Sequence, residues 1–310
     1  MMHTVKATAM AVLCCAVVGT GLVACEDSPS PAEKAVDKSI DDAVDEALDD
    51  ALGNTFTGTK KIKVGDRSVN VSCSGKTAEK DQPLVLLLAG VGDGLGKIAG
   101  LQKTLSEQAR VCSYDRLGEG ASDKPKGLQH QADSAKILTA VLDDVAGDRP
   151  AVLAGHSLGG QIAARYAPEH QDRVKGLVLM DATIPALNAG VSKAIPKSAT
   201  GQGAQLLAGT IAANSGENQE KFVIEDAKVS SAGDIPVEII KHESQYAEVP
   251  EYGPALEEMW SKGQEQWLAL SSNSKLSTAA KSGHYIYVDR PDLAIKAVRK
   301  VTAQATDDLR

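Results

Sequence analysis

Residues 151–161 place a serine where it could act as a nucleophile. A short apolar run ends in Gly-His-Ser-Leu-Gly at residues 155–159, and an amphipathic helical pattern follows at once. Strand, sharp turn and helix are the context in which Gly-x-Ser-x-Gly marks a nucleophile elbow. Glycines are needed there because the turn is strained and its flanks approach the neighbouring strand and helix. The motif predicts a reactive hydroxyl on Ser157; the alternative is an ordinary glycine-rich turn.

Strands and helices alternate along the chain on both sides of this turn. Such alternation predicts an α/β fold, a doubly wound and mainly parallel sheet with right-handed crossovers. Residues 182–234 are rich in Ala, Gly and Ser and interrupt the alternation, which predicts a lid inserted over the site. We expect a hairpin over 59–73, strands over 84–89, 111–114, 151–156, 174–180, 235–240 and 276–280, and helices over 95–105, 132–145, 253–270 and 291–305, besides the helix after Ser157.

Four motifs in order carry a resemblance to a known family. They are Leu-Ala-Gly-Val at 88–91, Tyr-Asp-Arg-Leu-Gly-Glu-Gly-Ala-Ser at 114–122, the turn at 155–160, and Ser-Gly-His at 282–284. Together they make the chain resemble the α/β-hydrolase fold family from about residue 62 to residue 301. The resemblance implies an eight-stranded α/β-hydrolase domain over 58–310, with its lid at about 182–234.

A serine hydroxyl needs a base to take its proton. His284 lies on the loop after the last expected strand, where the order of the family's motifs places the base. His156 lies inside the turn and is interpreted as structural, and His3 belongs to the leader. The remaining histidines are interpreted as surface or helix-end residues; they are His130, His170 and His242.

The acid that would orient the imidazole has two candidates. Asp181 follows the sixth strand, where some members of the family carry their acid, and it is the preferred candidate. Many other members carry an Asp after the seventh strand. Here that segment has no Asp, so Glu243 is the alternative.

The resemblance also implies an oxyanion hole and a reaction. Leu158, after the serine, and Val91, after Gly90, would supply backbone N–H donors. Ser157 would form an acyl-enzyme that water hydrolyses, with a small acyl compound, by default a carboxylic ester, as substrate. Amide or lactone cleavage and perhydrolysis stay open, and the rival class is a catalytically silent scaffold that serves as a surface binding protein. No cofactor or metal is expected.

The cysteines suit an exported protein. Cys14 and Cys15 lie in residues 1–24, which have the features of a signal peptide. Leu-Val-Ala-Cys at 22–25 resembles the lipobox of bacterial lipoproteins, which implies lipidation of Cys25 and an anchor on the extracytoplasmic face of the membrane; the alternative is a plain secretory leader. In the family's fold the second and fourth strands are neighbours, which implies a disulfide between Cys73 and Cys112; two free thiols are the alternative.

Residues 25–57 are expected to form an acidic helical stalk. Residues 26–52 contain ten Asp or Glu against two Lys, a charge of −8 that equals the net charge of the whole protein. Apolar residues recur every four positions from Val36 to Leu52, which favours a helix with one apolar stripe. It is interpreted as a spacer, with partner binding or oligomerisation as the alternative. The charge argues against a nucleic-acid partner.

Overall fold

The computed structural model describes residues 56–76 and 82–309, which lie in one compact unit, Leu48–Arg310. The expected signal peptide, Cys25 and nearly all of the expected stalk lie outside the described residues. No helix in the described ranges is long and apolar enough to cross a membrane.

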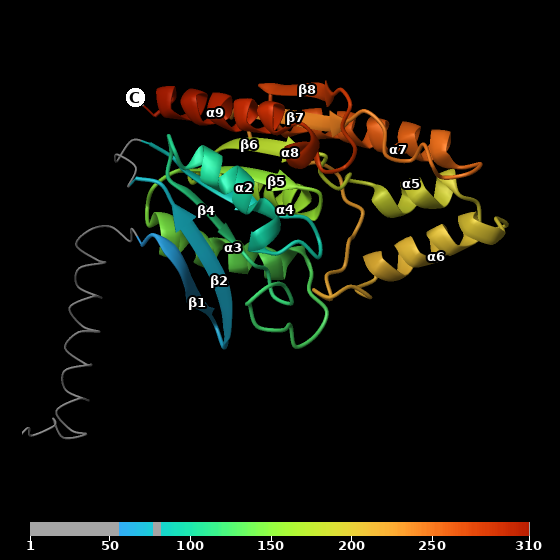
Figure 1. Ribbon diagram of the computed structural model, residues 1–310, viewed down its shortest axis with the longest axis horizontal. Coiled ribbons are helices and arrows are strands. Elements are labelled where there is room, and N and C mark those ends of the chain that lie inside the picture. Colours follow the sequence, from blue (N-terminus) through green and yellow to red (C-terminus); the bar gives the residue numbers. More distant parts are fainter. Residues whose placement is uncertain (1–55, 77–81, 310) are drawn as a thin grey trace, which may run out of the picture. The chain divides into compact units, whose positions relative to one another are not determined.

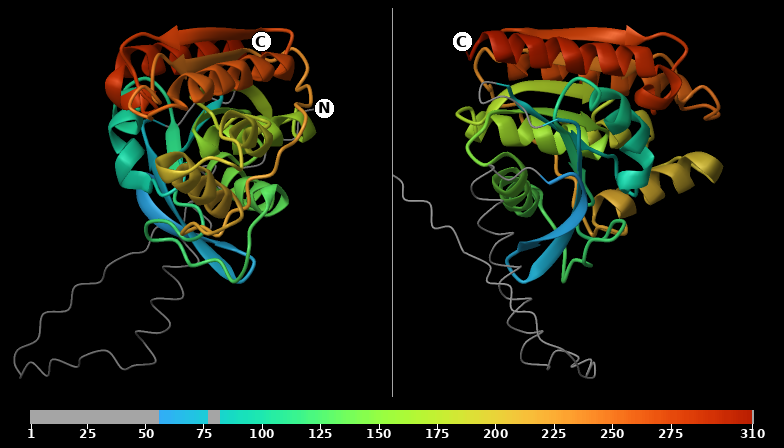
Figure 2. Two further views of the ribbon diagram at one scale, coloured as in Figure 1. Left: turned by 90° about the vertical axis from the view of Figure 1, so that its right-hand side faces the viewer. Right: turned by 60° about the vertical axis from the view of Figure 1, so that its left-hand side comes forward.

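Eight strands form one sheet in the order β1-β2-β4-β3-β5-β6-β7-β8. The first two pairings, β1 with β2 and β2 with β4, are antiparallel, and all the others are parallel. Figure 2 shows the hairpin β1–β2 in blue at one edge and β8 in orange at the other. The strands are β1 (Gly58–Val64), β2 (Arg67–Ser74), β3 (Leu84–Leu88), β4 (Val111–Tyr114), β5 (Ala151–His156), β6 (Val174–Met180), β7 (Val237–His242) and β8 (Ser274–Ala279).

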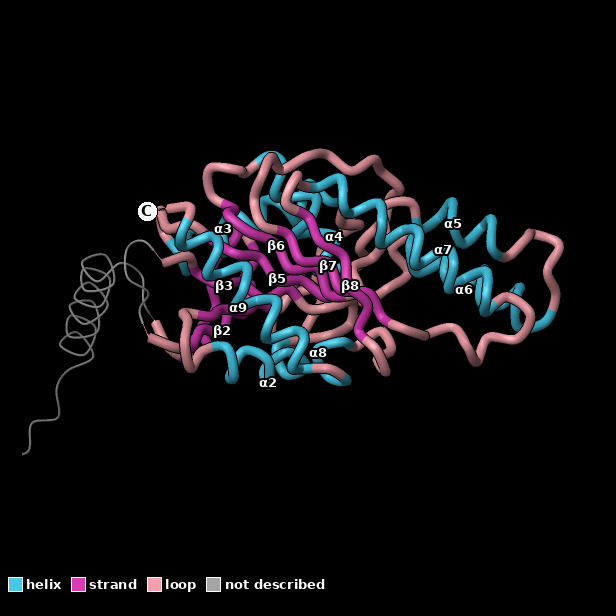
Figure 3. The backbone as a smooth tube through the Cα atoms, turned by 90° about the horizontal axis from the view of Figure 1, so that it is seen from above, coloured by secondary structure: helices cyan, strands magenta, loops and turns pink. Residues whose placement is uncertain are grey.

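Helices cover both faces of this sheet, so the central strands are apolar throughout rather than alternating. On one face α2, α8 and α9 pack together against β3, β5 and β6 (Figure 3). On the other face α3 and α4 cover the core. The helices are α2 (Leu95–Leu105), α3 (Gln131–Ala146), α4 (Leu158–Tyr166), α5 (Leu187–Ala194), α6 (Gly201–Asn214), α7 (Gly253–Gln266), α8 (Ile286–Asp289) and α9 (Pro291–Asp307), with 3-10 turns at Ala167–Glu169 and Trp267–Leu270.

The segment between β6 and β7 carries α5 and α6, which lie beside α7 at one end of the sheet (Figure 1). Their apolar contacts form a small core of their own around Ile184, Leu207 and Trp260. The next stretch returns to the main core, where Phe222 is 2% exposed. The insertion is therefore packed at both of its ends, and its action as a lid remains a prediction.

A disulfide joins Cys73 of β2 to Cys112 of β4. The two cysteines face each other in the antiparallel register of these strands, and both are buried. Because they are 39 residues apart, the bond closes a loop that includes β3 and α2.

Several expected element boundaries differ from the structure, among them those of β7, β8 and α7. The expected strand 235–240 lies two residues later, because the pairing of β7 with β8 continues to His242 opposite Ala279. The last strand begins at Ser274, and the expected helix 253–270 ends at Gln266 and continues as a 3-10 turn. The short helix α8 had no expected counterpart, because four residues are too few to show a period.

Candidate active site

Ser157 occupies the turn between β5 and α4 in a conformation that L-residues rarely adopt. Its φ is 51° and its ψ is −122°. The N–H of Ser157 donates to the carbonyl of Met180, and its own carbonyl accepts from Thr183. A Cβ on Gly159 would lie 2.3 Å from the carbonyl oxygen of Leu88, so only glycine fits there. The strained turn is thus held by neighbouring strands on both sides.

Asp181 follows β6 directly and is fully buried, also at a positive φ of 47°. Its Oδ2 lies 2.6 Å from Nδ1 of His284. Burial alone would raise the pKa of Asp181, but hydrogen bonds from His242 and His284 outweigh it and lower the pKa to about 2. The carboxyl group is therefore ionised at neutral pH and accepts from both imidazoles.

Glu243, the alternative acid, is exposed, and its Oε2 accepts a hydrogen bond from the backbone N–H of Lys281. The geometry thus favours Asp181 over Glu243 as the partner of His284.

His284 lies between β8 and α8, with 21% of its side chain exposed. An ionised carboxylate only accepts, so Nδ1 of His284 carries a proton; in the neutral ring Nε2 then keeps the lone pair that a base needs. No hydrogen bond of the described residues joins this ring to the hydroxyl of Ser157. Such contacts commonly tighten only when substrate binds.

His156 connects the turn to the histidine loop. Its Nε2 lies 2.9 Å from the carbonyl oxygen of His284, and the two rings are 4.5 Å apart. Burial, and after it the charge of His284, lower the pKa of His156 to about 3. The ring is therefore neutral and donates from Nε2, which fixes the backbone that carries His284.

The interpretation of His242 as a surface or helix-end residue is wrong. His242 ends β7, is 4% exposed, and its Nδ1 lies 2.7 Å from the same Oδ2 of Asp181. The other ring nitrogen, Nε2, lies 2.9 Å from Oε2 of Glu257 on α7. Trp260, one turn further along α7, donates its indole N–H to Oδ1 of Asp181 at 2.9 Å. The carboxylate is thus held by three side chains.

Asp181, His242 and His284 also have the composition of a metal site, since their ligand atoms lie within 4.8 Å of one another. The distances of 2.6 and 2.7 Å from each ring to Oδ2 argue against that reading. Two ligand atoms of one tetrahedral zinc lie roughly 3 Å or more apart, given bonds of about 2 Å. Asp181, His242 and His284 therefore fit a hydrogen-bonded cluster. The ring nitrogens that face Asp181 carry protons, whereas a metal ligand would need a lone pair there.

The loop after β3 carries the expected oxyanion donor Val91. Arg116 holds this loop, because its guanidinium donates to the carbonyls of Ala89 at 2.7 Å and Gly90 at 2.8 Å. No hydrogen bond of the described residues uses the N–H of Val91. The N–H of Leu158 opens α4, and the first N–H groups of a helix have no acceptor within it. Both backbone donors are thus available to a ligand.

The same arginine ties the insertion to that loop. Arg116 forms a two-pronged ion pair with Glu220, at 2.6 and 2.8 Å, and both side chains are buried. Glu119, 1% exposed, accepts from the N–H of Gly92 and lies beside the same pair. Burial, and after it the hydrogen bond to Glu220, raise the pKa of Glu119 well above its usual range. Burial would also raise the pKa of Glu220, but the charge of Arg116 stabilises its carboxylate and the pKa is lowered.

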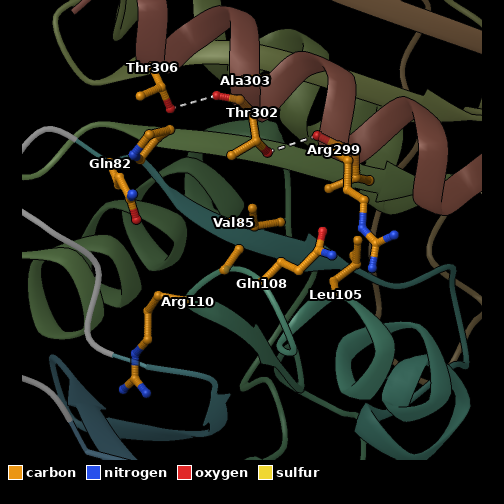
Figure 4. A pocket seen from close by; sticks show the side chains of 12 residues that line it. Gln82, Val85, Leu105, Gln108, Arg110, Arg299, Thr302, Ala303 and Thr306 are labelled. Atoms are coloured by element: carbon orange, nitrogen blue, oxygen red, sulfur yellow. Dashed lines mark hydrogen bonds between the residues drawn. The ribbon is translucent and has the colours of Figure 1, made fainter.

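Two cavities lie away from these residues. One of about 390 Å³ lies between α5 and α7 and is lined by Ile184, Met259 and others. Another of about 190 Å³ lies where β3 begins, between Val85 and the helix α9 (Figure 4). Figure 4 shows the hydroxyls of Thr302 and Thr306 turned back onto α9, where they donate to its backbone. Because Ser157 follows the other end of the parallel strands, this second cavity is separate from the site.

Comparison with known proteins agrees with this fold. The sequence model of the alpha/beta hydrolase fold matches residues 83–236. The chain belongs to the α/β-hydrolase fold family. The enol-lactonase of Burkholderia xenovorans superposes with a TM-score of 0.55 at 18% identity, over 79% of this chain and 100% of the enzyme, a likeness of fold.

Curated relatives match only part of this α/β-hydrolase chain. An uncharacterized protein of Mycobacterium tuberculosis is 33% identical over 103 residues, 32% of this chain and 29% of the relative. A putative carbamate hydrolase of Azorhizobium caulinodans is 33% identical over 97 residues, 31% of this chain and 36% of that protein. The similarity thus spans about a third of the length of each relative.

Sequence reasoning missed the support around Asp181 and the loop after β3. Glu257, Trp260 and Glu220 reach the site from segments without a recognisable motif. The one usable signal for His242 was its place at the carboxyl end of the strand after β6, since such ends meet at the ligand edge of an α/β sheet.

Proposed function

We propose that the protein is a serine hydrolase that cleaves a small acyl compound, by default a carboxylic ester. Ser157 acts as nucleophile, His284 as general base and Asp181 as the acid that orients it. The observation that supports this most is the 2.6 Å hydrogen bond between His284 and the buried carboxylate of Asp181, next to the strained turn of Ser157. A carbamate, the substrate class in the name of the A. caulinodans relative, also has an attackable carbonyl.

In the proposed reaction, Nε2 of His284 takes the proton of Ser157 as its oxygen attacks the carbonyl carbon. The imidazolium is stabilised by Asp181, and the N–H groups of Leu158 and Val91 face the developing oxyanion. His284 then protonates the leaving group, which departs and leaves an acyl-serine. A water molecule, deprotonated by the same ring, hydrolyses this ester and regenerates the hydroxyl.

We propose that residues 182–234 act as the lid of this site. The ion pair of Glu220 with Arg116 supports this, because it links the insertion to the loop of Val91. Export with a lipid anchor at Cys25 is also proposed, on sequence grounds, and the buried disulfide suits an oxidising compartment. Labelled palmitate should enter the wild type and not Cys25→Ala; equal labelling of both would contradict the anchor.

A panel of p-nitrophenyl esters of increasing acyl length tests the reaction. We expect turnover of at least one ester, and its loss by a thousandfold or more in Ser157→Ala. The folded wild type failing on every ester, with Ser157→Ala indistinguishable from it, would contradict ester hydrolysis. Parallel assays of lactones and anilides would show whether another acyl bond is cleaved instead.

A further inference from the structure

His242 shares the carboxylate of Asp181 with the proposed base, His284, and its other ring nitrogen contacts a second acid, Glu257. The chain of contacts runs from His284 Nδ1 to Asp181 Oδ2 at 2.6 Å, from there to His242 Nδ1 at 2.7 Å, and from His242 Nε2 to Glu257 Oε2 at 2.9 Å. Both ring nitrogens of His242 thus face carboxylate oxygens.

Both of these acids are placed to be ionised. Asp181 also accepts the indole N–H of Trp260 and the backbone N–H of His242 at its Oδ1. Glu257 accepts the backbone N–H groups of Gln245 and Tyr246 at its Oε1. These donors, together with His242, lower the pKa of Glu257 against the opposing effect of burial. A carboxylate so surrounded has only lone pairs to offer.

A ring between two ionised carboxylates must donate at both nitrogens. We propose that His242 is a positioning residue that is protonated at neutral pH. As an imidazolium it offsets one of the two negative charges of Asp181 and Glu257, and it thereby sets the basicity of His284. This inference rests on the proposed function of His284, but the charge of His242 can be measured without it.

The surroundings of His242 are consistent with a cation. Burial opposes protonation, but the contacts with Asp181 and then Glu257 raise the pKa of the ring. A cavity of about 280 Å³ reaches the ring from the outside and gives it a route for proton exchange. The titratable groups that face His242 or line this cavity are Asp181, Lys241, Glu243, Tyr246, Glu257, Glu258 and His284. Most of them are acids.

The consequence for catalysis follows from charge repulsion. When His284 takes the proton of Ser157 it becomes a second imidazolium on the same Oδ2. The positive charge of His242 makes that state less favourable and keeps His284 a free base to lower pH. A ring nitrogen of His242 lies within 4.8 Å of a ring nitrogen of His284. A charge at such a distance changes the protonation equilibrium by about one pH unit at an intermediate dielectric. Without the charge of His242, Nε2 of His284 would already be protonated at a higher pH and could not act as the base.

The first test measures the protons on His242 directly. In long-range ¹H–¹⁵N spectra of histidine-labelled protein at pH 7, we expect His242 to show two protonated ring nitrogens, assigned by their loss in His242→Asn. In Glu257→Gln the ring should lose its proton at lower pH than in the wild type. A neutral ring in the wild type at pH 7, or an unchanged titration in Glu257→Gln, would overturn the proposal.

The second test measures the basicity of His284. The rate at which a fluorophosphonate labels Ser157 is recorded against pH in the wild type and in His242→Asn, whose amide can still donate to Asp181. We expect the acid limb to move up by about one pH unit, with about tenfold slower labelling on that limb. His170→Asn, a half-buried histidine stacked on Tyr166, is the matched control and should leave the limb in place.

The outcomes separate the two proposals. An unchanged acid limb in folded His242→Asn would overturn the role of His242 while leaving the hydrolase intact. If the wild type is not labelled at any pH, the proposed function fails, and the spectra still decide whether His242 is charged.

Discussion

Asp181 is the residue on which the assignment of the acid depends. In Asp181→Asn, the amide can donate to His284 and favour the wrong tautomer of the ring. We expect the rate of ester hydrolysis to fall by about a thousandfold or more, with little change in fold.

The matched control is Glu243→Gln, at an exposed side chain that contacts the backbone of Lys281. It should keep the rate within about twofold, as surface changes usually do. Near-full activity in Asp181→Asn combined with collapse in Glu243→Gln would reverse the assignment.

At this scale the sequence predicted the residues that belong to motifs. Ser157 and His284 belong to motifs, so the order of the motifs was enough to propose them. Asp181 was proposed only from its place after the sixth strand, with Glu243 as the alternative. His242 was misinterpreted because its partners, Asp181 and Glu257, come from another strand and from a helix. Only the folded chain brings these carboxylates to the two sides of one ring.

Among the elements, the loop after β3 depends on Arg116. Its flat guanidinium binds two carbonyls of the loop and both oxygens of Glu220 at once, which a lysine cannot do. We expect Arg116→Lys to lower kcat for an ester by about 10- to 100-fold through displacement of the N–H of Val91.

The control is Lys126→Arg, which exchanges lysine and arginine in the opposite direction. Lys126 lies at the surface in an exposed ion pair with Asp66. This exchange should leave kcat unchanged. Equal kcat values for Arg116→Lys and the wild type would show that the loop does not need this support.

The acid pair beside Arg116 gives the fold a pH dependence. Because the folded state raises the pKa of Glu119, it binds this proton more tightly than the unfolded chain does. The stability from the protonated form is complete below the usual pKa of about 4.5 and is lost as pH rises through the raised value. Glu119→Gln, which stays uncharged, should therefore melt about 2–4 °C higher than the wild type at pH 9, a gain on the order of 1 kcal/mol.

At pH 5 the melting temperatures of Glu119→Gln and the wild type should nearly coincide. A constant difference between them from pH 5 to pH 9 would contradict the buried proton.

The elements themselves were largely readable from sequence. Continuous apolar runs identified the central strands, because a sheet covered on both faces needs them. The hairpin β1–β2 was identified instead from its alternation of apolar and polar residues. The predicted boundaries of β7, β8 and α7 differ from those of the structure, since they are set by pairing and packing with distant segments. The insertion showed little periodicity because α6 buries few of its residues.

For the whole molecule, the disulfide Cys73–Cys112 is expected to contribute to stability. In the chain-entropy view, closing a loop of 39 residues adds about 3–4 kcal/mol. We expect the double variant Cys73→Ser, Cys112→Ser to melt well below the wild type, with reducing agent lowering the wild type to a similar extent. A melting temperature that is the same in the double variant, and in the wild type with reducing agent, as in the untreated wild type would contradict this contribution.

The central claim is that Ser157 is an activated nucleophile. The most direct measurement is treatment of the folded protein with a fluorophosphonate, followed by mass spectrometry of its peptides. We expect a single adduct on Ser157, absent in Ser157→Ala and formed at least a hundredfold more slowly in His284→Gln. No adduct in the folded wild type, or an adduct on another serine that survives in Ser157→Ala, would contradict the account and favour a binding protein without catalysis.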